Sequence, residues 1–228
     1  MLTILIPAYN EENILEISVN KIFKKLYQFE NEFQVLVVNN NSNDKTENVC
    51  MLLQTKYDKF FFINEPLQGK GNAIKSGLKN ALYKNILILD ADLSVSIDQF
   101  DINWVQKNIT NKCVNGSRYK GVVIGTPLQR NFTGKVFSFI VKMLFDLPVN
   151  DTQCGFKFIS YSEPKKIAEK MTIGNFAYDI DLLLVLKNLN VAIEEVPVTY
   201  IHNNDSAVNI FKDSFKMIVS LIELKKKY

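Results

Sequence analysis

The segment FQVLVVNNNSND, residues 33–44, runs a continuous apolar stretch directly into three asparagines, Asn39, Asn40 and Asn41. An apolar run without polar alternation is typical of a strand that is buried on both faces of a parallel sheet. The same pattern occurs in LTILIPA (2–8), KFFFIN (59–64) and NILILDA (85–91), with helical periodicity between the runs. We therefore expect an α/β fold, an open and mostly parallel sheet with helices on both faces.

The second half of the chain continues this alternation. It predicts strands at KCVNGSR (112–118) and VAIEEVPVTY (191–200), and helices near 130–146, 178–189 and 208–226. A chain of 228 residues is long enough for one substantial core. We therefore expect a single α/β domain over residues 1–205, followed by an amphipathic helix with a basic end over residues 206–228.

The composition is that of a soluble globular protein and excludes several classes of function. Hydrophobic residues make up 47% and charged residues 22%, and the formal net charge of +3 calls for no nucleic-acid partner. The opening MLTILIPAYNEEN lacks a basic signal-peptide start, and no apolar run reaches the roughly 18 residues of a membrane span. Cys50, Cys113 and Cys154 form no CxxC pair, so we expect neither a zinc site nor a disulfide framework, and a reducing cytosol fits best.

Polar residues gather where the expected strands end, in PAYNEEN, NNNSND, NEPLQGKG and DADLS. In open parallel sheets, ligands bind beyond the carboxyl ends of the strands. Asp90 and Asp92 can both reach one point there, and a divalent cation between them would relieve their repulsion. The single histidine, His202, excludes a multi-histidine site, so oxygen ligands and Mg²⁺ or Mn²⁺ are favoured. A turn with a helix-capping aspartate explains the same motif.

Two features suit phosphate. Gly69 and Gly71 flank Lys70 immediately before an expected helix, where glycines allow close approach and the helix N-terminus attracts anions. The spacing is not that of a Walker A motif, and an ordinary loop with a helix start accounts for it as well. Arg118 and Arg130 are the two arginines of a lysine-rich chain, and a planar bidentate fork is a reason to keep them, although chance explains them too.

Three further acids lie in apolar surroundings. We assign Asp151, in NDTQCGFKF, to the site. Asp179 and Asp181, in NFAYDIDLLLV, open a helix, and complementing the helix dipole is enough to explain Asp181.

The expected helix near 130–146 has an unusually wide apolar face. Its polar positions, Asn131, Lys135, Ser138 and Lys142, form one narrow stripe at helical spacing. The apolar face either packs within the domain or lies on a bilayer with lysines at headgroup level. The tail NIFKDSFKMIVSLIELKKKY repeats the pattern, and its basic end suits anionic lipid or solvent alike.

The motifs ILIPAYNEEN, VVNNNSNDKT, GKGNAIKSGL, LDADLS, NGSR, DTQCGFK and AYDIDLLL occur in the order found in family 2 glycosyltransferases of the GT-A fold. The chain resembles this family from its first strand to about residue 200. The last three motifs are most similar to the dolichyl-phosphate β-glucosyltransferase subgroup, with dolichol-phosphate mannose synthases and bacterial polyprenyl-phosphate glycosyltransferases close by.

The resemblance implies roles for the residues at the strand ends. The nucleotide-sugar donor would contact Pro7, Ala8, Tyr9, Glu11, Asn39, Asn40, Lys70, Asp90, Ala91 and Asp92, and Asp90 and Asp92 would also bind Mg²⁺ or Mn²⁺. Arg118 and Arg130 would hold phosphate, including that of a lipid acceptor, and Gln153 would line the active site. Catalysis would depend on Asp92, Asp151, Arg118 and Arg130.

The chain departs from the family pattern in two respects. The family usually has acids at the places of Asn39 and Asn40, where an asparagine keeps the turn and one acceptor oxygen but loses the charge. Asp44 occupies the place of a later acid of that motif. Eukaryotic members of the subgroup carry an N-terminal membrane helix, which this sequence does not contain. We therefore expect peripheral contact with the membrane, or else a soluble acceptor.

The resemblance implies an inverting transfer of a hexose, glucose from UDP-glucose, to a polyprenyl or dolichyl phosphate. We expect a cytoplasmic protein that is peripherally associated with the membrane surface, and a homo-oligomer or a separate membrane-anchoring partner fits this expectation. The alternatives are a family 2 enzyme that uses GDP-mannose or a glycan acceptor, and a non-catalytic sugar-nucleotide-binding protein with a degenerate site. A nucleotidyltransferase would instead release pyrophosphate.

Overall fold

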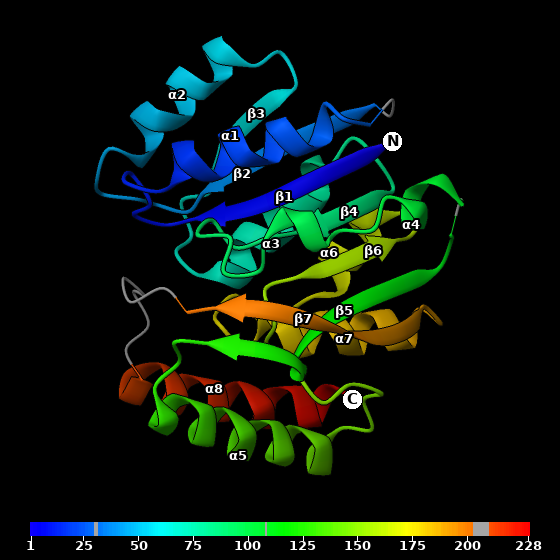
Figure 1. The fold of residues 1–228 in the computed structure, drawn as a ribbon. Helices are drawn as coiled ribbons and strands as arrows, with labels where there is room; N and C mark the ends of the chain where they lie inside the picture. The colour runs from blue at the N-terminus through cyan, green and yellow to red at the C-terminus, as the bar shows by residue number, and fades with distance from the viewer. Residues whose placement is uncertain (30–31, 108, 203–209) are drawn as a thin grey trace.

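The computed structural model describes residues 1–29, 32–107, 109–202 and 210–228, without the side chains of 128–133 and 210–216. Within these residues the chain forms one seven-stranded sheet with the strand order β3-β2-β1-β4-β6-β5-β7 (Figure 1). The strands are β1 (Leu2–Ala8), β2 (Phe33–Asn39), β3 (Phe60–Asn64), β4 (Asn85–Ile88), β5 (Lys112–Ile124), β6 (Lys157–Ser160) and β7 (Ala192–Ile201).

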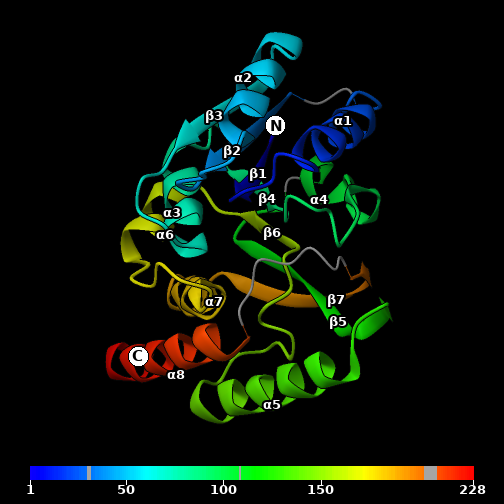
Figure 2. The same cartoon turned by 90° about the vertical axis from the view of Figure 1, so that its left-hand side faces the viewer.

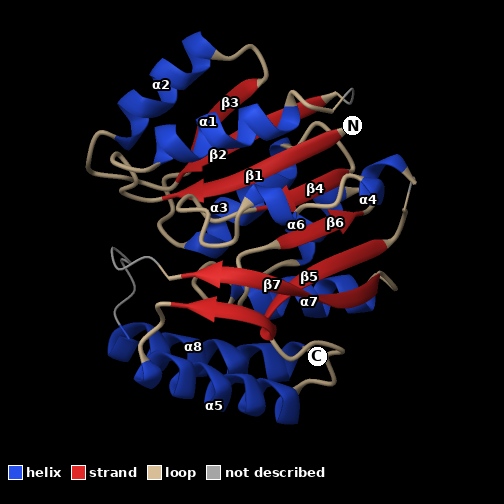
Figure 3. Ribbon diagram, in the orientation of Figure 1, coloured by secondary structure: helices blue, strands red, loops and turns tan. Residues whose placement is uncertain are grey.

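Helices cover both faces of this sheet (Figure 3). The helices are α1 (Leu15–Leu26), α2 (Thr46–Lys56), α3 (Lys70–Asn80), α4 (Asn103–Gln106), α5 (Leu128–Leu144), α6 (Pro164–Lys170), α7 (Tyr178–Asn188) and α8 (Ile210–Lys227), with a 3₁₀ turn, η1 (Ile97–Gln99). The expected helices near 130–146, 178–189 and 208–226 correspond to α5, α7 and α8.

Alternate residues of the central strands pack into two separate cores. Leu36 and Val38 of β2 lie in the core with α3 and α7, whereas Val35 and Val37 lie in the core with α1 and α2. Each of these side chains is almost fully buried, and burying one aliphatic side chain contributes about 1.5–3 kcal/mol. Burial on both faces explains why the strand has no polar alternation.

The strand directions bring the functional loops to one edge of the sheet. β1, β2, β3, β4, β5 and β7 share one direction, and β6 alone runs antiparallel, between β4 and β5. The loops after β1, β2, β3 and β4 therefore lie at the same edge as the loop that leads into β6. This arrangement confirms the open, mostly parallel sheet with helices on both faces. The sequence analysis did not predict β6 or α6.

Helices α5 and α8 lie together at the end of the molecule below β5 and β7 (Figure 2). Lys225 Nζ near the end of α8 donates to the carbonyl of Leu144 at the end of α5, at 3.0 Å. The boundary that we expect at 205/206 falls between β7 and α8, outside the described residues. The division into a domain and a terminal helix therefore stays a prediction.

Candidate active site

The loops after β1 and β2 are joined by hydrogen bonds that build one wall of the site. The amide of Asn40 donates to the carbonyl of Ala8 at 2.8 Å, and the amide of Glu11 donates to Thr46 Oγ1 at 2.8 Å. Asp44 accepts from the amides of Glu12 and Thr46, at 3.1 and 2.9 Å. Burial alone would raise the pKa of Asp44, but hydrogen bonding from the side chain and amide of Thr46 and from the amide of Glu12 lowers it. Asp44 therefore holds the two loops together at the start of α2.

Residues Pro7 to Tyr9 lie at the end of β1, where its loop begins. Ala8 is buried and pairs with Asn39 across the sheet, whereas Pro7 and Tyr9 are partly exposed at the sheet edge. The predicted donor residues Pro7, Ala8, Tyr9 and Glu11 thus occupy neighbouring positions beside the carboxyl end of β2.

The two asparagines that end β2 point in different directions. Asn40 Nδ2 donates to the carbonyls of Leu67 and Glu65, at 2.8 and 3.3 Å, and Asn40 Oδ1 accepts from the amide of Gly69 at 2.7 Å. Only an amide side chain can donate and accept in this way, because a carboxylate has no donor. Asn40 therefore secures the loop that leads to Lys70.

Asn39 lies on the opposite face of the strand. Its Nδ2 donates to Asn64 Oδ1 at 2.9 Å, and Asn64 Nδ2 donates to Glu47 Oε1 at 2.7 Å. This chain of hydrogen bonds links the ends of β2 and β3 to α2. Asn39 is 4% exposed, so its side chain is buried at the end of β2, and its contact with the donor stays a prediction.

The glycine turn before α3 presents Lys70 to Asp90. Gly69 has a φ of 136°, and a Cβ at this position would lie 2.2 Å from the carbonyl oxygen of Gly174, so glycine is required here. Lys70 Nζ lies 2.5 Å from Asp90 Oδ1. On the other side of Asp90, a Cβ on Gly155 would lie 1.9 Å from Asp90 Oδ2. Asp90 is thus held between an ammonium group and the backbone before β6.

Asp90 and Asp92 follow β4 in a tight turn around buried Ala91. Burial would raise the pKa of Asp90, but Lys70, Lys157 and Arg118 outweigh it and lower the pKa. Asp92 accepts from the amide and the hydroxyl of Ser94, at 2.9 and 2.6 Å. Leu93, between Asp92 and Ser94, has a φ of 48°. This conformation costs energy for a non-glycine residue and occurs often at functional sites.

Glu11, in the loop after β1, is near enough to the two aspartates for their charges to act on it. Burial and then the negative charges of Asp92 and Asp90 raise its pKa from 4.5 to about 7. Three carboxyl groups therefore share a region in which full ionisation is unfavourable without a positive charge.

Of the two aspartates predicted to bind a divalent cation, Asp92 has free lone pairs, and a role for Asp90 as a second ligand stays a prediction. Asp90 already pairs with Lys70, whereas each oxygen of Asp92 accepts one hydrogen bond and keeps a free lone pair. The described residues contain no group of three or more His, Cys, Asp or Glu side chains arranged to enclose a metal. Asp92 would therefore hold the ion, with the remaining ligands coming from a donor diphosphate and water, as is usual for Mg²⁺.

Arg118 and Asp151 form a bidentate ion pair across the site from the acids. Arg118 Nε and Nη2 lie 2.8 Å from the two carboxylate oxygens of Asp151, and the Arg118 amide adds a bond of 2.9 Å. Asp151 is 1% exposed. Despite burial, Asp151 raises the pKa of Arg118, so the guanidinium stays charged. Since both oxygens of Asp151 bind Arg118, this aspartate orients the arginine and is not a free base.

Glu195 on β7 supports this pair, and the sequence analysis missed its role. Its Oε1 accepts from the amides of Asn150 and Asp151, at 2.9 and 2.8 Å, and Lys120 Nζ lies 3.1 Å from its Oε2. Burial would raise the pKa of Glu195, but these donors lower it. The adjacent acids in VAIEEVPVTY were a signal, because Glu195 faces inward while Glu194 is exposed.

A second buried ion pair lies behind Asp90. Lys157 Nζ is fully buried, 2.5 Å from Asp179 Oδ1 and 2.6 Å from the carbonyl of Cys154. Burial raises the pKa of Asp179, against the effect of Lys157 and Lys70. Asp179 therefore belongs to a buried ion pair. The prediction that the helix dipole is enough to explain Asp181 is wrong, because this buried carboxylate accepts hydrogen bonds from the amides of Thr172 and Ile173. The sequence analysis gave Lys157 no role, since the DTQCGFK motif does not reveal that this lysine points inward.

Beside Arg118 the surface has a hollow of about 440 Å³ between β5, β7 and the start of α5. Its lining residues are Arg118, Tyr119, Gly121, Val123, Thr126, Gly134, Lys135 and Tyr200. The guanidinium carbon of Arg118 lies 5.5 Å from the ring centre of Tyr200. The hollow combines two cations, Arg118 and Lys135, with aromatic walls, and the charge of Arg118 also lowers the pKa of Asp90.

One predicted residue, Gln153, points away from this arrangement, and a second, Arg130, is only partly described. Gln153 Nε2 lies 4.0 Å from Met217 Sδ on α8, so it faces the C-terminal helix. The side chain of Arg130 lies outside the described residues, although its backbone belongs to the first turn of α5.

Helix α5 turns Ser138 and Lys142 of its polar stripe toward Asn150, beside Asp151, and part of its apolar face outward. Lys142 Nζ donates to Asn150 Oδ1 at 3.0 Å, and Ser138 Oγ donates to the Asn150 carbonyl. Val141 is buried in the core, so part of the apolar face packs within the protein. Phe139 and Met143, however, are 64% and 72% exposed.

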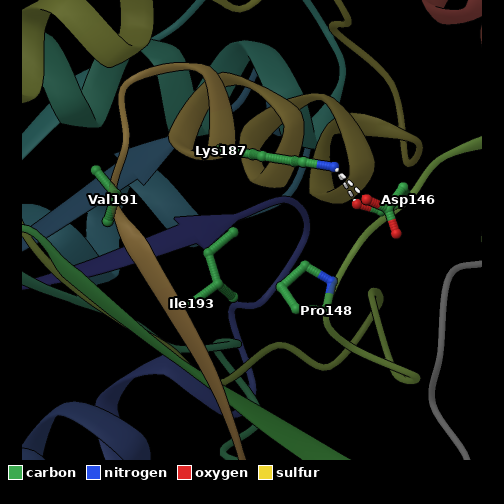
Figure 4. A pocket seen from close by; sticks show the side chains of 5 residues that line it. All are labelled: Asp146, Pro148, Lys187, Val191 and Ile193. Carbon is green, nitrogen blue, oxygen red and sulfur yellow. Dashed lines mark hydrogen bonds and ion pairs between the residues drawn. The ribbon is translucent and has the colours of Figure 1, made fainter.

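A smaller hollow of about 210 Å³ lies at the start of β7, away from this edge (Figure 4). It is lined by Asp146, Pro148, Lys187, Val191 and Ile193, and it contains the ion pair between Lys187 and Asp146 at 3.0 Å. With this pair closed and no other ionisable side chain in its lining, the hollow has no feature of an active site.

Comparison with known proteins gives consistent matches. The family model for glycosyl transferase family 2 matches residues 3–158. A dolichyl-phosphate beta-glucosyltransferase of Trichomonas vaginalis is 29% identical over 238 residues, which cover 98% of this chain and 72% of that protein. The dolichyl-phosphate beta-glucosyltransferase of Mus musculus is 26% identical over 246 residues, covering 100% of this chain and 75% of that protein.

Among solved structures, glucosyl-3-phosphoglycerate synthase from Mycobacterium tuberculosis in complex with UDP superposes with a TM-score of 0.71. The match covers 99% of this chain and 80% of that chain at 15% identity. The same enzyme with Mn²⁺, UDP-glucose and phosphoglyceric acid gives a TM-score of 0.68 at 14% identity, with the same coverage. At such identities these matches show a shared fold.

Proposed function

The chain belongs to glycosyl transferase family 2 and has the GT-A fold, and on that basis we propose that it transfers glucose from UDP-glucose to a polyprenyl phosphate. The observation that carries this proposal is the position of Arg118, which lines the cationic hollow and whose charge also lowers the pKa of Asp90 in the acidic cluster. The names of the relatives from Trichomonas vaginalis and Mus musculus support dolichyl phosphate as the acceptor.

On the donor side, this chain would bind a nucleoside diphosphate sugar between the β1 loop and the glycine turn. Lys70 would neutralise part of the diphosphate, and Asp92 would hold Mg²⁺ or Mn²⁺. A bound divalent ion would screen the charge that develops on the departing UDP. Asn40 would keep the turn with Lys70 in place, so no acid is needed at this position.

On the acceptor side, Arg118 would hold the acceptor phosphate at the mouth of the hollow. One phosphate oxygen would attack the anomeric carbon of glucose, forming the new C–O bond as the bond to UDP breaks, with inversion at that carbon. The phosphate is already an anion at neutral pH, so the reaction needs positioning and charge stabilisation more than a general base. This requirement agrees with Asp151, whose oxygens both bind Arg118.

The exposed apolar side chains of α5 and α8 support peripheral binding to a membrane surface. Phe139, Met143, Ile218 and Ile222 are 64%, 72%, 52% and 55% exposed. In the parts of the chain that the structure describes, no helix is both long and apolar enough to cross a bilayer. An apolar face beside Lys135 and Lys142 suits insertion at the boundary between headgroups and acyl chains.

A degenerate, non-catalytic site is the main alternative, and it predicts that the asparagines mark lost function. The hydrogen bonds of Asn40 argue against this alternative. Its side-chain amide donates to two backbone carbonyls and accepts from the amide of Gly69, and a carboxylate could not donate these bonds. GDP-mannose as donor and a glycan as acceptor remain outcomes that experiment can distinguish.

Two measurements test the proposal. In the first, UDP, GDP and CMP are added with and without Mn²⁺, and the melting temperature is followed, since a ligand that binds the native state raises it. We expect a manganese-dependent rise with UDP alone; a rise with GDP alone would favour the mannose branch, and no rise with any of them would favour the degenerate site.

In the second, Phe139→Asp is compared with Met51→Asp in flotation with vesicles that contain anionic lipid. Met51 is similarly apolar and 51% exposed, but it lies on α2, far along the sheet from α5 (Figure 1). We expect only the change at Phe139 to weaken vesicle binding. Equal flotation of both variants would contradict the membrane face.

A further inference from the structure

We propose that the last turn of α8 positions the donor site from behind, through a buried aspartate on α7. In this arrangement Lys227 and Asp181 hold the segment 170–175 against the glycine turn that carries Lys70. The inference rests on the proposed function for the identity of the donor, although its structural part can be tested without any ligand.

The first link joins α8 to α7. Lys227 Nζ lies 3.3 Å from Asp181 Oδ1, and it also donates to the carbonyl of Lys170 at 2.6 Å. The side chain of Asp181 is 0% exposed, whereas that of Lys227 is 31% exposed. A carboxylate at this depth requires a compensating charge or several donors, and Lys227 supplies the charge.

The second link joins Asp181 to the segment 170–175. Asp181 Oδ2 accepts from the backbone amides of Thr172 and Ile173, at 2.5 and 2.8 Å. Lys227 Nζ reaches Thr172 Oγ1 at 3.4 Å, so it contacts the same segment directly. The carboxylate thus fixes the backbone of this connection between α6 and α7.

The third link joins this segment to the glycine turn. The amide of Asn72 donates to the carbonyl of Gly174 at 3.2 Å, as well as to Gly69 within the turn at 2.9 Å. A Cβ on Gly71 would lie 2.4 Å from the carbonyl of Ile173, so the two backbones are in direct contact. A displacement of Ile173 or Gly174 therefore moves the turn that orients Lys70 toward Asp90.

Helix α8 holds the same segment at a second point. Asn175 Nδ2 donates to Ser220 Oγ at 2.8 Å, two turns before Lys227 along the helix. The segment is thus enclosed between α8 on one side and the start of α3 on the other. Lys227 acts through Asp181 and contacts no substrate, so it is a positioning residue and not a catalytic one.

The test uses Lys227→Met with Lys226→Met as the matched control. Lys226 is the neighbouring lysine, is exposed, and makes no ion pair within the described residues. Hydrogen–deuterium exchange of the ligand-free protein reports on the turn, because the amides of Asn72 and Ala73 are bonded within it. We expect Lys227→Met to raise exchange over 69–74 and 170–175 by at least about five-fold. This is the upper limit for losing an exposed ion pair, and Asp181 is buried and loses its compensating charge.

Steady-state kinetics separate positioning from general loss of structure. We expect Lys227→Met to raise the KM for UDP-glucose about five-fold while the KM for the acceptor stays within about two-fold, and Lys227→Arg to restore the donor KM. Lys226→Met should match the wild type in both assays.

The possible results distinguish the positioning role of Lys227 and Asp181 from the proposed function. The positioning role would be overturned if Lys227→Met matched Lys226→Met in exchange over 69–74 and in the KM for UDP-glucose. It would also be overturned if Lys227→Met raised exchange over 170–175 alone. A wild-type protein that neither binds UDP with Mn²⁺ nor uses UDP-glucose would contradict the proposed function. Hydrogen–deuterium exchange of the ligand-free variants would still decide whether Lys227 and Asp181 position the glycine turn.

Discussion

Asn40→Asp tests whether the asparagines after β2 are functional or degenerate. The change is nearly isosteric and restores the acid that is usual in the family. In the structure, however, Asn40 Nδ2 donates to Leu67 and Glu65, while its Oδ1 accepts from Gly69. An aspartate keeps only the bond from Gly69 and turns its second carboxylate oxygen toward two carbonyl oxygens.

The magnitude follows from these contacts. Two hydrogen bonds are lost at about 1 kcal/mol each, and one unpaired buried oxygen adds at least about 1 kcal/mol. A loss of about 3 kcal/mol lowers the melting temperature of a domain of this size by about 10 °C. Burial among carbonyl oxygens raises the pKa of the new carboxyl group. The loss should therefore be smaller at pH 5 than at pH 8, because the neutral form is favoured in the folded state.

The assay is thermal unfolding at both pH values, with UDP binding in the presence of Mn²⁺ measured in parallel. Asn41→Asp is the control, because Asn41 is exposed and its φ of 58° is tolerated by aspartate. We expect Asn40→Asp to weaken UDP binding by loosening the turn that carries Lys70. An Asn40→Asp variant that is as stable as the control, or that binds UDP more tightly than the wild type, would refute this reasoning.

Three further predictions concern the acids and the arginine. Asp92→Asn should reduce transfer by roughly a thousandfold while the fold is retained by circular dichroism; substantial residual activity would contradict the cation site. Arg118→Lys cannot keep the bidentate pair with Asp151, so kcat/KM should fall about a hundredfold, and an unchanged value would remove Arg118 from the acceptor site. The pKa of Glu11, raised from 4.5 to about 7 by burial and by the two aspartates, means that the ligand-free fold loses stability as pH rises through 7. Glu11→Gln should therefore raise the melting temperature more at pH 8 than at pH 5, and an equal effect at both would count against the predicted repulsion.

The sheet and the position of the site could be predicted from local patterns. The continuous apolar runs of β1, β2 and β4 require burial on both faces, and this requirement fixes a parallel sheet with a polar carboxyl edge. Because Asp90 and Asp92 directly follow such a run, their place at this edge follows from chain connectivity alone.

The supporting residues could not be predicted, because their role depends on contacts between distant parts of the chain. Lys157 is a lysine that faces the interior, and only the antiparallel insertion of β6 beside β4 brings it behind Asp90. Glu195 lies 44 positions from Asp151 in the sequence. Successive residues of a strand point to opposite faces, so a shift of one residue in the register of β7 would turn Glu194 inward in place of Glu195. The sequence around Asn40 is typical of a turn. The three hydrogen bonds of its side chain depend on the loop after β3, whose position the sequence does not give.

The most direct test of the central claim is transfer of labelled glucose from UDP-glucose by the purified protein. The reaction contains Mn²⁺ and vesicles with dolichyl phosphate, and Asp92→Asn serves as the inactive control. We predict label in the lipid phase as glucosyl dolichyl phosphate for the wild type, roughly a thousandfold less for Asp92→Asn, and none when labelled GDP-mannose replaces UDP-glucose. No lipid product from wild-type protein that binds UDP, or transfer only to a soluble acceptor, would contradict the proposed function.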